Sequence, residues 1–148
     1  MSKAVDTKRG IISVANAFYD AFNARDLERA REVIASDAKM IYMAGGDFIQ
    51  GPAAVREMWQ GWLTAFPDAR VEVATMTVGE NRIAVEFVGR GTHTGPLVIG
   101  NETIAPTGRR IELHYCDVHT IREGKIHELR VYVDEGVMFE QLEVARPT

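Results

Sequence analysis

The stretch RRIELHYCDVHTIREGKIHELRVYVDEG, residues 109–136, decides how this chain folds. Two runs of alternating apolar and polar residues flank Glu123-Gly124, and such a pair is typical of a two-residue β-turn because Gly tolerates the positive φ that the turn needs. The stretch therefore predicts a β-hairpin. Its register is predicted to pair Arg122 with Lys125, Ile121 with Ile126, His119 with Glu128, Asp117 with Arg130, Tyr115 with Tyr132 and Leu113 with Asp134.

One face of this hairpin is predicted to hold an unusual polar cluster, because side chains alternate between the two faces of a strand. Acids, bases and phenols set among Leu and Ile are typical of a functional site rather than of a plain core. The opposite face is predicted to expose an apolar row, Leu129, Val131 and Val133. The polar face is predicted to carry Leu113, Tyr115, Asp117, His119 and Ile121 opposite Ile126, Glu128, Arg130, Tyr132 and Asp134.

The composition indicates one globular domain with a real core. The chain has 148 residues, of which 46% are hydrophobic and 26% charged, close to the average of folded domains. A net charge of −4 without a basic stripe argues against a nucleic-acid partner. The single cysteine, Cys116, excludes an internal disulfide framework. We find no signal-peptide pattern and no apolar run near the ~18 residues of a membrane span, so we expect a cytoplasmic protein.

The first half of the chain predicts helices and a short hairpin. Residues 1–9 are polar and expected to be flexible, and apolar residues at helical spacing predict a helix over residues 10–23. Asp26 is placed to N-cap a second helix that runs to about residue 35. Short strands at residues 39–43 and 47–50 are predicted around Gly45-Gly46. Gly51-Pro52 opens a third helix, which ends at Pro67-Asp68.

From residue 70 onward the apolar period changes to two, which predicts strands over residues 70–77 and 82–91. Gly89 and Gly91 inside the second strand indicate a bend or a bulge, so this strand is expected to curl. Residues 94–108 are predicted to be a loop, followed by the hairpin and a helix over residues 135–142. Together these elements predict an α+β fold: a cone-shaped half-barrel whose curved, mixed or antiparallel sheet and three N-terminal helices enclose a pocket.

Several motifs, taken in order and spacing, resemble those of one known family. They are Phe18-Tyr19 with Asn23-Ala24-Arg25-Asp26, Gly51-Pro52, Phe66-Pro67-Asp68, residues 89–95, residues 106–110, Asp117, Gly124-Lys125-Ile126 and Tyr132-Val133-Asp134. The chain resembles the SnoaL-like polyketide cyclases of the nuclear transport factor 2-like superfamily over residues 10–142. The resemblance implies a single such domain over residues 10–148 and frequent homo-oligomers. It implies a fold more strongly than a reaction, since the superfamily also holds isomerases, epoxide hydrolases, dehydratases and non-catalytic binders.

The resemblance makes Asp134 the first candidate catalytic residue. In SnoaL-like cyclases the carboxylate at the matching position is the acid/base of an intramolecular aldol ring closure, and an apolar cavity would raise its pKa. The alternative is that Asp134 caps the helix predicted from Glu135. His119 is the second candidate: oriented by Glu128, it would donate a hydrogen bond to a substrate carbonyl as enolate charge develops. The alternative is a core histidine.

Further residues are candidates for substrate binding, each with a simpler structural alternative. A pair of Asp117 and Arg130 is more often structural than catalytic. His93 would lie at the cavity mouth or order its loop, and Tyr19 is expected in the core. The substrate-binding set is Tyr132, Arg130, Asp117, Tyr115, Trp59, Phe18, Tyr42 and His93. The aromatic members would stack on a flat substrate or simply pack, and the phenols could donate protons.

We expect no metal and no cofactor, because the four histidines are scattered and no glycine motif joins a strand to a helix. The expected function is that of a cofactor-independent acid/base enzyme, a lyase or isomerase that acts on a small apolar carbonyl compound by a polyketide-cyclase-like aldol closure. The alternatives are an isomerase, hydrolase or dehydratase of the same fold, or a non-catalytic small-molecule-binding domain. The apolar row at Leu129, Val131 and Val133 predicts a homodimer through the outer sheet face.

Overall fold

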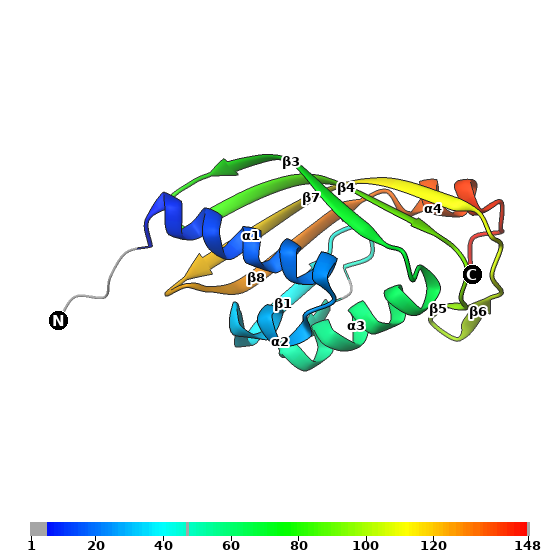
Figure 1. The fold of residues 1–148 in the computed structure, drawn as a ribbon, viewed down its shortest axis with the longest axis horizontal. Coiled ribbons are helices and arrows are strands. Elements are labelled where there is room, and N and C mark those ends of the chain that lie inside the picture. The colour runs from blue at the N-terminus through cyan, green and yellow to red at the C-terminus, as the bar shows by residue number, and fades with distance from the viewer. Residues whose placement is uncertain (1–5, 47, 148) are drawn as a thin grey trace.

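A curved mixed sheet arches over three helices (Figure 1). The computed structural model describes residues 6–46 and 48–147. The elements, in chain order, are α1 (Lys8–Ala24), α2 (Leu27–Glu32), β1 (Ile34–Tyr42), β2 (Phe48–Gln50), α3 (Gly51–Ala65), β3 (Arg70–Val78), β4 (Arg82–Thr92), β5 (Leu97–Ile99), β6 (Glu102–Ile104), β7 (Arg110–Arg122), β8 (Lys125–Val133) and α4 (Glu135–Leu142). The α+β half-barrel predicted from the sequence is confirmed.

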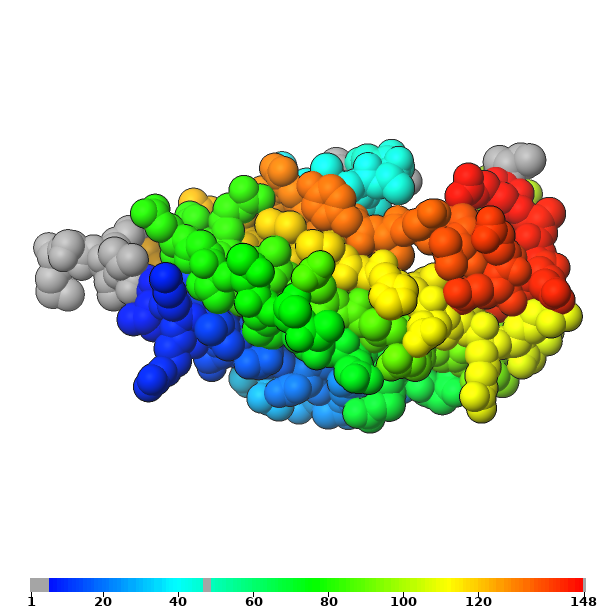
Figure 2. All heavy atoms as spheres, turned by 90° about the horizontal axis from the view of Figure 1, so that it is seen from above, coloured from blue at the N-terminus to red at the C-terminus, as the bar shows by residue number. Residues whose placement is uncertain are grey.

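The main sheet has the strand order β2-β1-β8-β7-β4-β3. All of its neighbouring strands are antiparallel except β1 and β8, which run parallel. The helices α1, α2 and α3 lie on the concave side, and α4 lies at one end of the sheet (Figure 1). From above, β3, β4, β7 and β8 form one surface, and the C-terminal part of the chain with α4 lies at one end of it (Figure 2). Among the described residues, no helix is long and apolar enough to cross a membrane.

Local signals set the helix ends as predicted, except that α1 begins earlier, at Lys8, and α2 ends earlier, at Glu32. Asp26 accepts a hydrogen bond from the Arg29 amide at 3.0 Å and caps α2. This helix ends at residue 32 rather than 35, because β1 begins at Ile34. The predicted flexible segment, residues 1–9, lies partly outside the described residues. Its described part is ordered: Thr7 caps α1, and Asp6 accepts hydrogen bonds from the amides of the Glu123-Gly124 turn.

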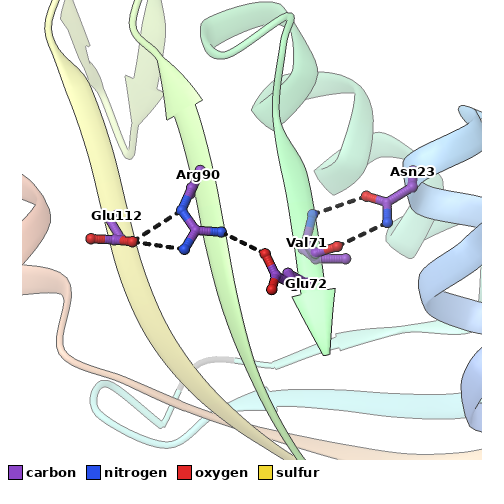
Figure 3. A network of polar contacts seen from close by, with 5 residues as sticks. All are labelled: Asn23, Val71, Glu72, Arg90 and Glu112. Atoms are coloured by element: carbon purple, nitrogen blue, oxygen red, sulfur yellow. Dashed lines mark hydrogen bonds and ion pairs between the residues drawn. The ribbon is translucent and has the colours of Figure 1, made fainter. Parts of the chain in front are cut away.

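The edge strand β3 is held by a side chain of α1. The Asn23 amide donates to the Val71 carbonyl and accepts from the Val71 amide, both at 2.9 Å (Figure 3). An edge strand has backbone groups that no other strand satisfies, and Asn23 satisfies two of them. On β4, Arg90 forms ion pairs with Glu72 of β3 and Glu112 of β7 (Figure 3). The Asn23 hydrogen bonds fix the position of β3 against α1, and the Arg90–Glu72 ion pair fixes it against β4.

The register of the β7–β8 hairpin is predicted correctly only next to the turn. Arg122 pairs with Lys125 and Ile121 with Ile126, and the turn residues have the positive φ values, 53° and 72°, that a two-residue turn needs. A β-bulge follows, in which Thr120 pairs with Glu128, so that His127 is the extra residue. The predicted pairs beyond it are wrong: His119 lies opposite Leu129, Asp117 opposite Val131 and Tyr115 opposite Val133.

The bulge reverses the two faces of β8 relative to β7. A shift of one residue moves every side chain of a strand to the opposite face. Leu129 and Val131 are now buried, with 3% and 6% of their surface exposed, whereas Tyr132 is 43% exposed. The unshifted register would have buried the charges of Glu128 and Arg130 and exposed the aliphatic side chains, which costs free energy on both counts. The predicted apolar dimer row is therefore wrong, because its residues face inward.

The chain between β4 and β7 also differs from the prediction. Residues 94–108 are not a plain loop, since β5 and β6 form a two-stranded sheet of their own. In β4 itself, the pairing with β7 runs through Gly89 and Gly91 without a shift, so a bend at these glycines involves no β-bulge. They make room instead: a Cβ at Gly89 would lie 3.0 Å from the Tyr115 ring, and one at Gly91 3.0 Å from the Phe66 Cβ.

Candidate active site

A cavity of about 680 Å³ lies between the helices and the concave face of the sheet. Its wall is largely apolar and aromatic. Phe18 and Trp59 come from α1 and α3, and Phe87 and Tyr115 come from the sheet. A volume of this size is in the usual range for a small-molecule site, and such sites combine an apolar wall with a few polar groups.

Asp117 is the buried carboxyl group of this wall. It lies on the inner face of β7 and is 3% exposed. Burial raises its pKa to about 7, because the charged form loses its hydration, and a hydrogen bond from Tyr19 only partly opposes the rise. The Oδ2 atom accepts that hydrogen bond at 2.7 Å, and Oδ1 has no partner among the described residues. A carboxyl group in this setting can exchange a proton near neutral pH.

Tyr19 joins Asp117 to His119. Its hydroxyl oxygen lies 2.7 Å from the His119 Nε2 as well as 2.7 Å from Asp117 Oδ2. His119 is fully buried, and burial lowers its pKa to about 3, so that the ring is neutral. The pKa of the Tyr19 phenol is raised, first by burial and then by the charge of Asp117. The chain Asp117–Tyr19–His119 thus combines one group that titrates near neutrality with two that do not.

Aromatic contacts hold this chain in place. The Phe18 ring packs edge-on against Tyr19, Trp59 and His119, with centroid distances of 5.2, 5.2 and 5.5 Å. Such edge contacts are favourable and directional. Of the predicted binding residues, Phe18 and Trp59 therefore line the cavity and also support the buried polar chain.

The predicted phenols Tyr42 and Tyr115 both line the cavity. The Tyr115 ring stacks on Phe87 at a centroid distance of 4.7 Å and an interplanar angle of 4°. Burial raises the pKa of both phenols, so each keeps its proton at neutral pH. The Tyr42 hydroxyl contacts the Met58 sulfur. Tyr115 lies on the same inner face of β7 as Asp117. The two positions are two residues apart, which is about 7 Å along the strand.

Asp134 is not placed where the sequence-based hypothesis needs it. It is exposed, follows the end of β8 and accepts a hydrogen bond from the Gly136 amide at 2.9 Å as the N-cap of α4. The capping alternative is thus confirmed. The physical reason is the bulge: it places Val133 on the cavity wall, so that the next residue, Asp134, is absent from that wall and caps the helix that follows β8.

The same bulge moves two predicted binding residues to the outer face of the sheet. Arg130 forms an ion pair with Glu128 at 2.7 Å on that face instead of pairing with Asp117. Tyr132 lies opposite Cys116 there. His119 is accordingly oriented by Tyr19. The sequence predicted Glu128 as its partner, and that prediction is wrong. None of these outer residues lines the cavity.

His93 orders a loop, as its structural alternative predicted. It is fully buried, and its Nδ1 accepts a hydrogen bond from the Thr107 amide at 3.2 Å. Burial lowers its pKa, and its ring packs on Phe66. His93 is absent from the cavity wall and joins the two ends of the segment that carries β5 and β6.

Tyr19, which the sequence predicts in the core, is the member of this polar chain that the predicted site lacks. One signal could have found it: within the apolar stripe of α1, Phe18, Tyr19 and Phe22, its hydroxyl is the one polar group. Such a group must find a partner when buried.

As for metals, no group of three or more His, Cys, Asp or Glu among the described residues could hold an ion.

Comparison with known proteins places this chain in one family. The family model of the SnoaL-like domain matches residues 15–129. IdmH from Streptomyces antibioticus, a candidate polyketide cyclase, is 30% identical and superposes with a TM-score of 0.75 over 90% of this chain and 99% of its own. The chain therefore belongs to the SnoaL-like family, within the nuclear transport factor 2-like superfamily. No curated protein matches the sequence.

More distant structures share the fold. A candidate SnoaL-like polyketide cyclase from Jannaschia sp. CCS1 is 17% identical, with a TM-score of 0.83 over 99% of this chain and all of its own (100%). TerC, crystallised with polyporic acid, is 18% identical, with a TM-score of 0.73 over 90% of this chain and 98% of its own. Similar folds also include a candidate ketosteroid isomerase and an epoxide hydrolase. The fold therefore accommodates several reactions.

Proposed function

We propose that this protein is a cofactor-independent acid/base enzyme that acts on a flat, largely apolar carbonyl compound, with Asp117 as the proton carrier. The observation that supports this most strongly is the position of Asp117. It is a buried carboxyl on the wall of an aromatic cavity, its pKa is raised to about 7, and one of its oxygens has no partner among the described residues. A base whose pKa lies near the working pH is the most effective kind.

The proposed reaction moves one proton out and back. Ionised Asp117 removes a proton from the carbon beside a carbonyl: the C–H bond breaks, an O–H bond forms on the carboxyl group, and the electron pair passes into an enolate. Tyr115 donates a hydrogen bond to the enolate oxygen, which lowers the barrier where negative charge develops. The enolate carbon then attacks a second carbonyl of the same molecule, and Asp117 returns the proton to the new alkoxide.

The aldol version is supported by membership of the SnoaL-like family and by the similarity to IdmH. An isomerase would use the same proton removal but return the proton to another carbon. A hydrolase would need Asp117 to activate a water molecule instead. A non-catalytic binder would use the cavity alone. The product formed from a diketone decides among these, because only the aldol closure makes a new ring.

Two carboxylates compete for the catalytic role, and matched variants separate them. We expect Asp117→Asn to lower kcat on aromatic and polyketide-like diketones by about 10²- to 10⁴-fold, while the affinity for a flat aromatic ligand survives. We expect Asp134→Asn to leave kcat within a few-fold, because its side chain caps α4 outside the cavity. Loss of turnover in Asp134→Asn with retained turnover in Asp117→Asn would overturn the proposal.

The homodimer and the cytoplasmic location stay predictions. Because Leu129 and Val131 face inward, a dimer through the outer sheet face would bury other residues, namely half-buried Val88 and Val118 and the exposed Tyr132. Sedimentation at dilute protein concentration tests this, and a species of monomer mass throughout would contradict it. Tyr132→Asp should weaken the dimer and leave the cavity unchanged.

A further inference from the structure

The Tyr19 hydroxyl lies between two buried groups and can satisfy only one of them as a donor. Its oxygen is 2.7 Å from Asp117 Oδ2 and 2.7 Å from His119 Nε2. A phenol has one hydrogen, so it donates to one neighbour and accepts from the other. An ionised carboxylate has no hydrogen to donate. When Asp117 is ionised, Tyr19 therefore donates to Asp117, and His119 must donate to Tyr19 through Nε2–H.

The state of the His119 ring agrees with this assignment. A neutral imidazole has one N–H, and the chain places it on Nε2. The Nδ1 atom is then a bare acceptor, and it is the ring nitrogen without a partner among the described residues. The Phe18 and Tyr19 rings pack edge-on against the imidazole, with interplanar angles of 74° and 89°, and hold its orientation.

The two oxygens of Asp117 consequently have different surroundings. Oδ2 receives the Tyr19 hydrogen bond, which stabilises negative charge on that atom. Oδ1 receives no hydrogen bond from the described residues and is the more basic of the two. A proton taken from a substrate is therefore held on Oδ1, and the hydrogen bonds on the other side need not rearrange.

Among the described residues packed around Asp117, none carries a positive charge that faces it. Tyr19 approaches from α1 and Tyr42 from β1, and Tyr115 and His119 flank it on β7. The cross-strand neighbours on β4 and β8 are Val85 and Val131. The remaining titratable neighbours, Cys116 on the outer face and Glu135 at the start of α4, carry no positive charge. The hydrogen-bond chain is thus what favours the ionised carboxylate.

We propose that His119 is a positioning residue, which donates through Nε2–H to Tyr19 and thereby fixes the Tyr19 proton on Oδ2 and reserves Oδ1 of Asp117 for exchange with the substrate. The proposal rests on the proposed role of Asp117 as the proton carrier. It gives His119 a different task from the one the sequence suggested, because His119 is absent from the cavity wall and donates to Tyr19 rather than to a substrate carbonyl.

The tautomer of His119 tests the proposal in the unaltered protein. The ¹⁵N chemical shifts of the imidazole distinguish a protonated from a bare nitrogen. We expect Nε2 to carry the proton and Nδ1 to be bare from about pH 5 to pH 8. A ring protonated at Nδ1, or at both nitrogens near neutral pH, would overturn the proposal.

Matched variants test whether His119 acts through Tyr19. In His119→Leu the Tyr19 oxygen loses its donor, and the ¹³C titration midpoint of the Asp117 carboxyl should rise by about one pH unit. In His119→Gln the side-chain amide can donate from a similar position, and the midpoint should stay near that of the wild type. In a Tyr19→Phe background, His119→Leu should add nothing further. Equal midpoints in wild type and His119→Leu, or a Leu effect that persists without the phenol, would contradict the proposal.

Turnover provides a separate readout. The acid limb of kcat/KM should move to higher pH in His119→Leu and recover in His119→Gln, with KM little changed in both. Full activity in Asp117→Asn would show that the proposed function is wrong. The ¹⁵N and ¹³C results would still decide whether His119 orders Tyr19 and Asp117, so the two failures are distinguishable.

Discussion

At the scale of single residues, burial shifts the pKa values of Asp117 and His119 in opposite directions, although both belong to one hydrogen-bonded chain. Burial raises the pKa of Asp117 to about 7 and lowers the pKa of His119 to about 3. Both shifts keep the group neutral where an exposed counterpart would be charged. Tyr19 connects the two groups, so the chain contains a single readily ionised member, Asp117.

These shifts predict opposite contributions to stability. The folded state holds the Asp117 proton more tightly than the unfolded state, so its contribution to stability is lost as pH rises from about 4 to about 7. Unfolded chains bind a proton at His119 more readily than the folded protein, so its contribution is lost as pH falls from about 6.5 to about 3. The two slopes oppose each other between about pH 4 and pH 6.5.

Urea unfolding at several pH values measures this directly. Asp117→Asn removes the pH-dependent contribution of Asp117 to the free energy of unfolding. We expect the stability of this variant relative to wild type to rise by up to about 4 kcal/mol between about pH 4 and pH 7. In His119→Gln the opposing term is lost, and the stability relative to wild type should rise as pH falls below about 6.5. A pH-independent difference for both variants would refute the assigned shifts.

At the scale of elements, the sequence predicts what local interactions determine. The helix cap at Asp26, the opening of α3 at Gly51-Pro52 and the Glu123-Gly124 turn each depend on a few consecutive residues, and each is confirmed. The inner face of β7 is also predicted correctly, because its apolar period is regular. Asp117, His119 and Tyr115 on that face belong to the part of the candidate site that could be predicted, together with Phe18, Trp59 and Tyr42 on the rest of the cavity wall.

The rest depends on contacts between distant segments. The bulge at His127 follows from burying Leu129 and Val131, a choice made by the whole core and not by the turn. The unshifted register predicts that Asp134, Arg130 and Tyr132 lie in the site. With the bulge, none of the three lines the cavity. Tyr19 enters the site because α1 crosses the inner face of β7, which helical periodicity cannot predict.

Truncation of neighbouring residues on β8 tests the bulge. Leu129 is 3% exposed, so Leu129→Ala should cost about 2–5 kcal/mol of unfolding free energy. The matched control is Arg130→Ala, which should cost less than about 1 kcal/mol because its ion pair with Glu128 is partly exposed. The unshifted register reverses this order, so a larger loss in Arg130→Ala would contradict the structure.

At the scale of the whole molecule, both layers build the cavity, and the β5–β6 sheet completes its wall. Pro96, Leu97, Val98 and Ile99 all line it. The segment is tied to the C-terminal end of α3 by hydrogen bonds from the Thr94 and Gly95 amides to the Ala65 carbonyl, both at 3.1 Å. A Cβ at Gly95 would lie 1.8 Å from the Thr64 carbonyl oxygen, so this contact needs glycine.

An exposed apolar residue on this wall should contribute to ligand affinity. Val98 is 66% exposed, and Val98→Lys should weaken binding of a flat aromatic ketone several-fold with little change in melting temperature. Met43, 37% exposed and absent from the cavity wall, supplies the control Met43→Lys, which should bind normally. Calorimetric titration of both variants compares them, and equal affinities would exclude Val98 from the binding surface.

The proposed chemistry depends most on one property, the elevated pKa of a carboxyl group enclosed in an aromatic cavity. Titration of the wild-type protein labelled with ¹³C at the aspartate carboxyl carbons measures it, with Asp117→Asn identifying the signal. We expect a midpoint near pH 7, moving when an aromatic ketone fills the cavity. A midpoint near 4, unchanged by any ligand, would mean that Asp117 is hydrated like a surface residue, and the proposed chemistry would have no base.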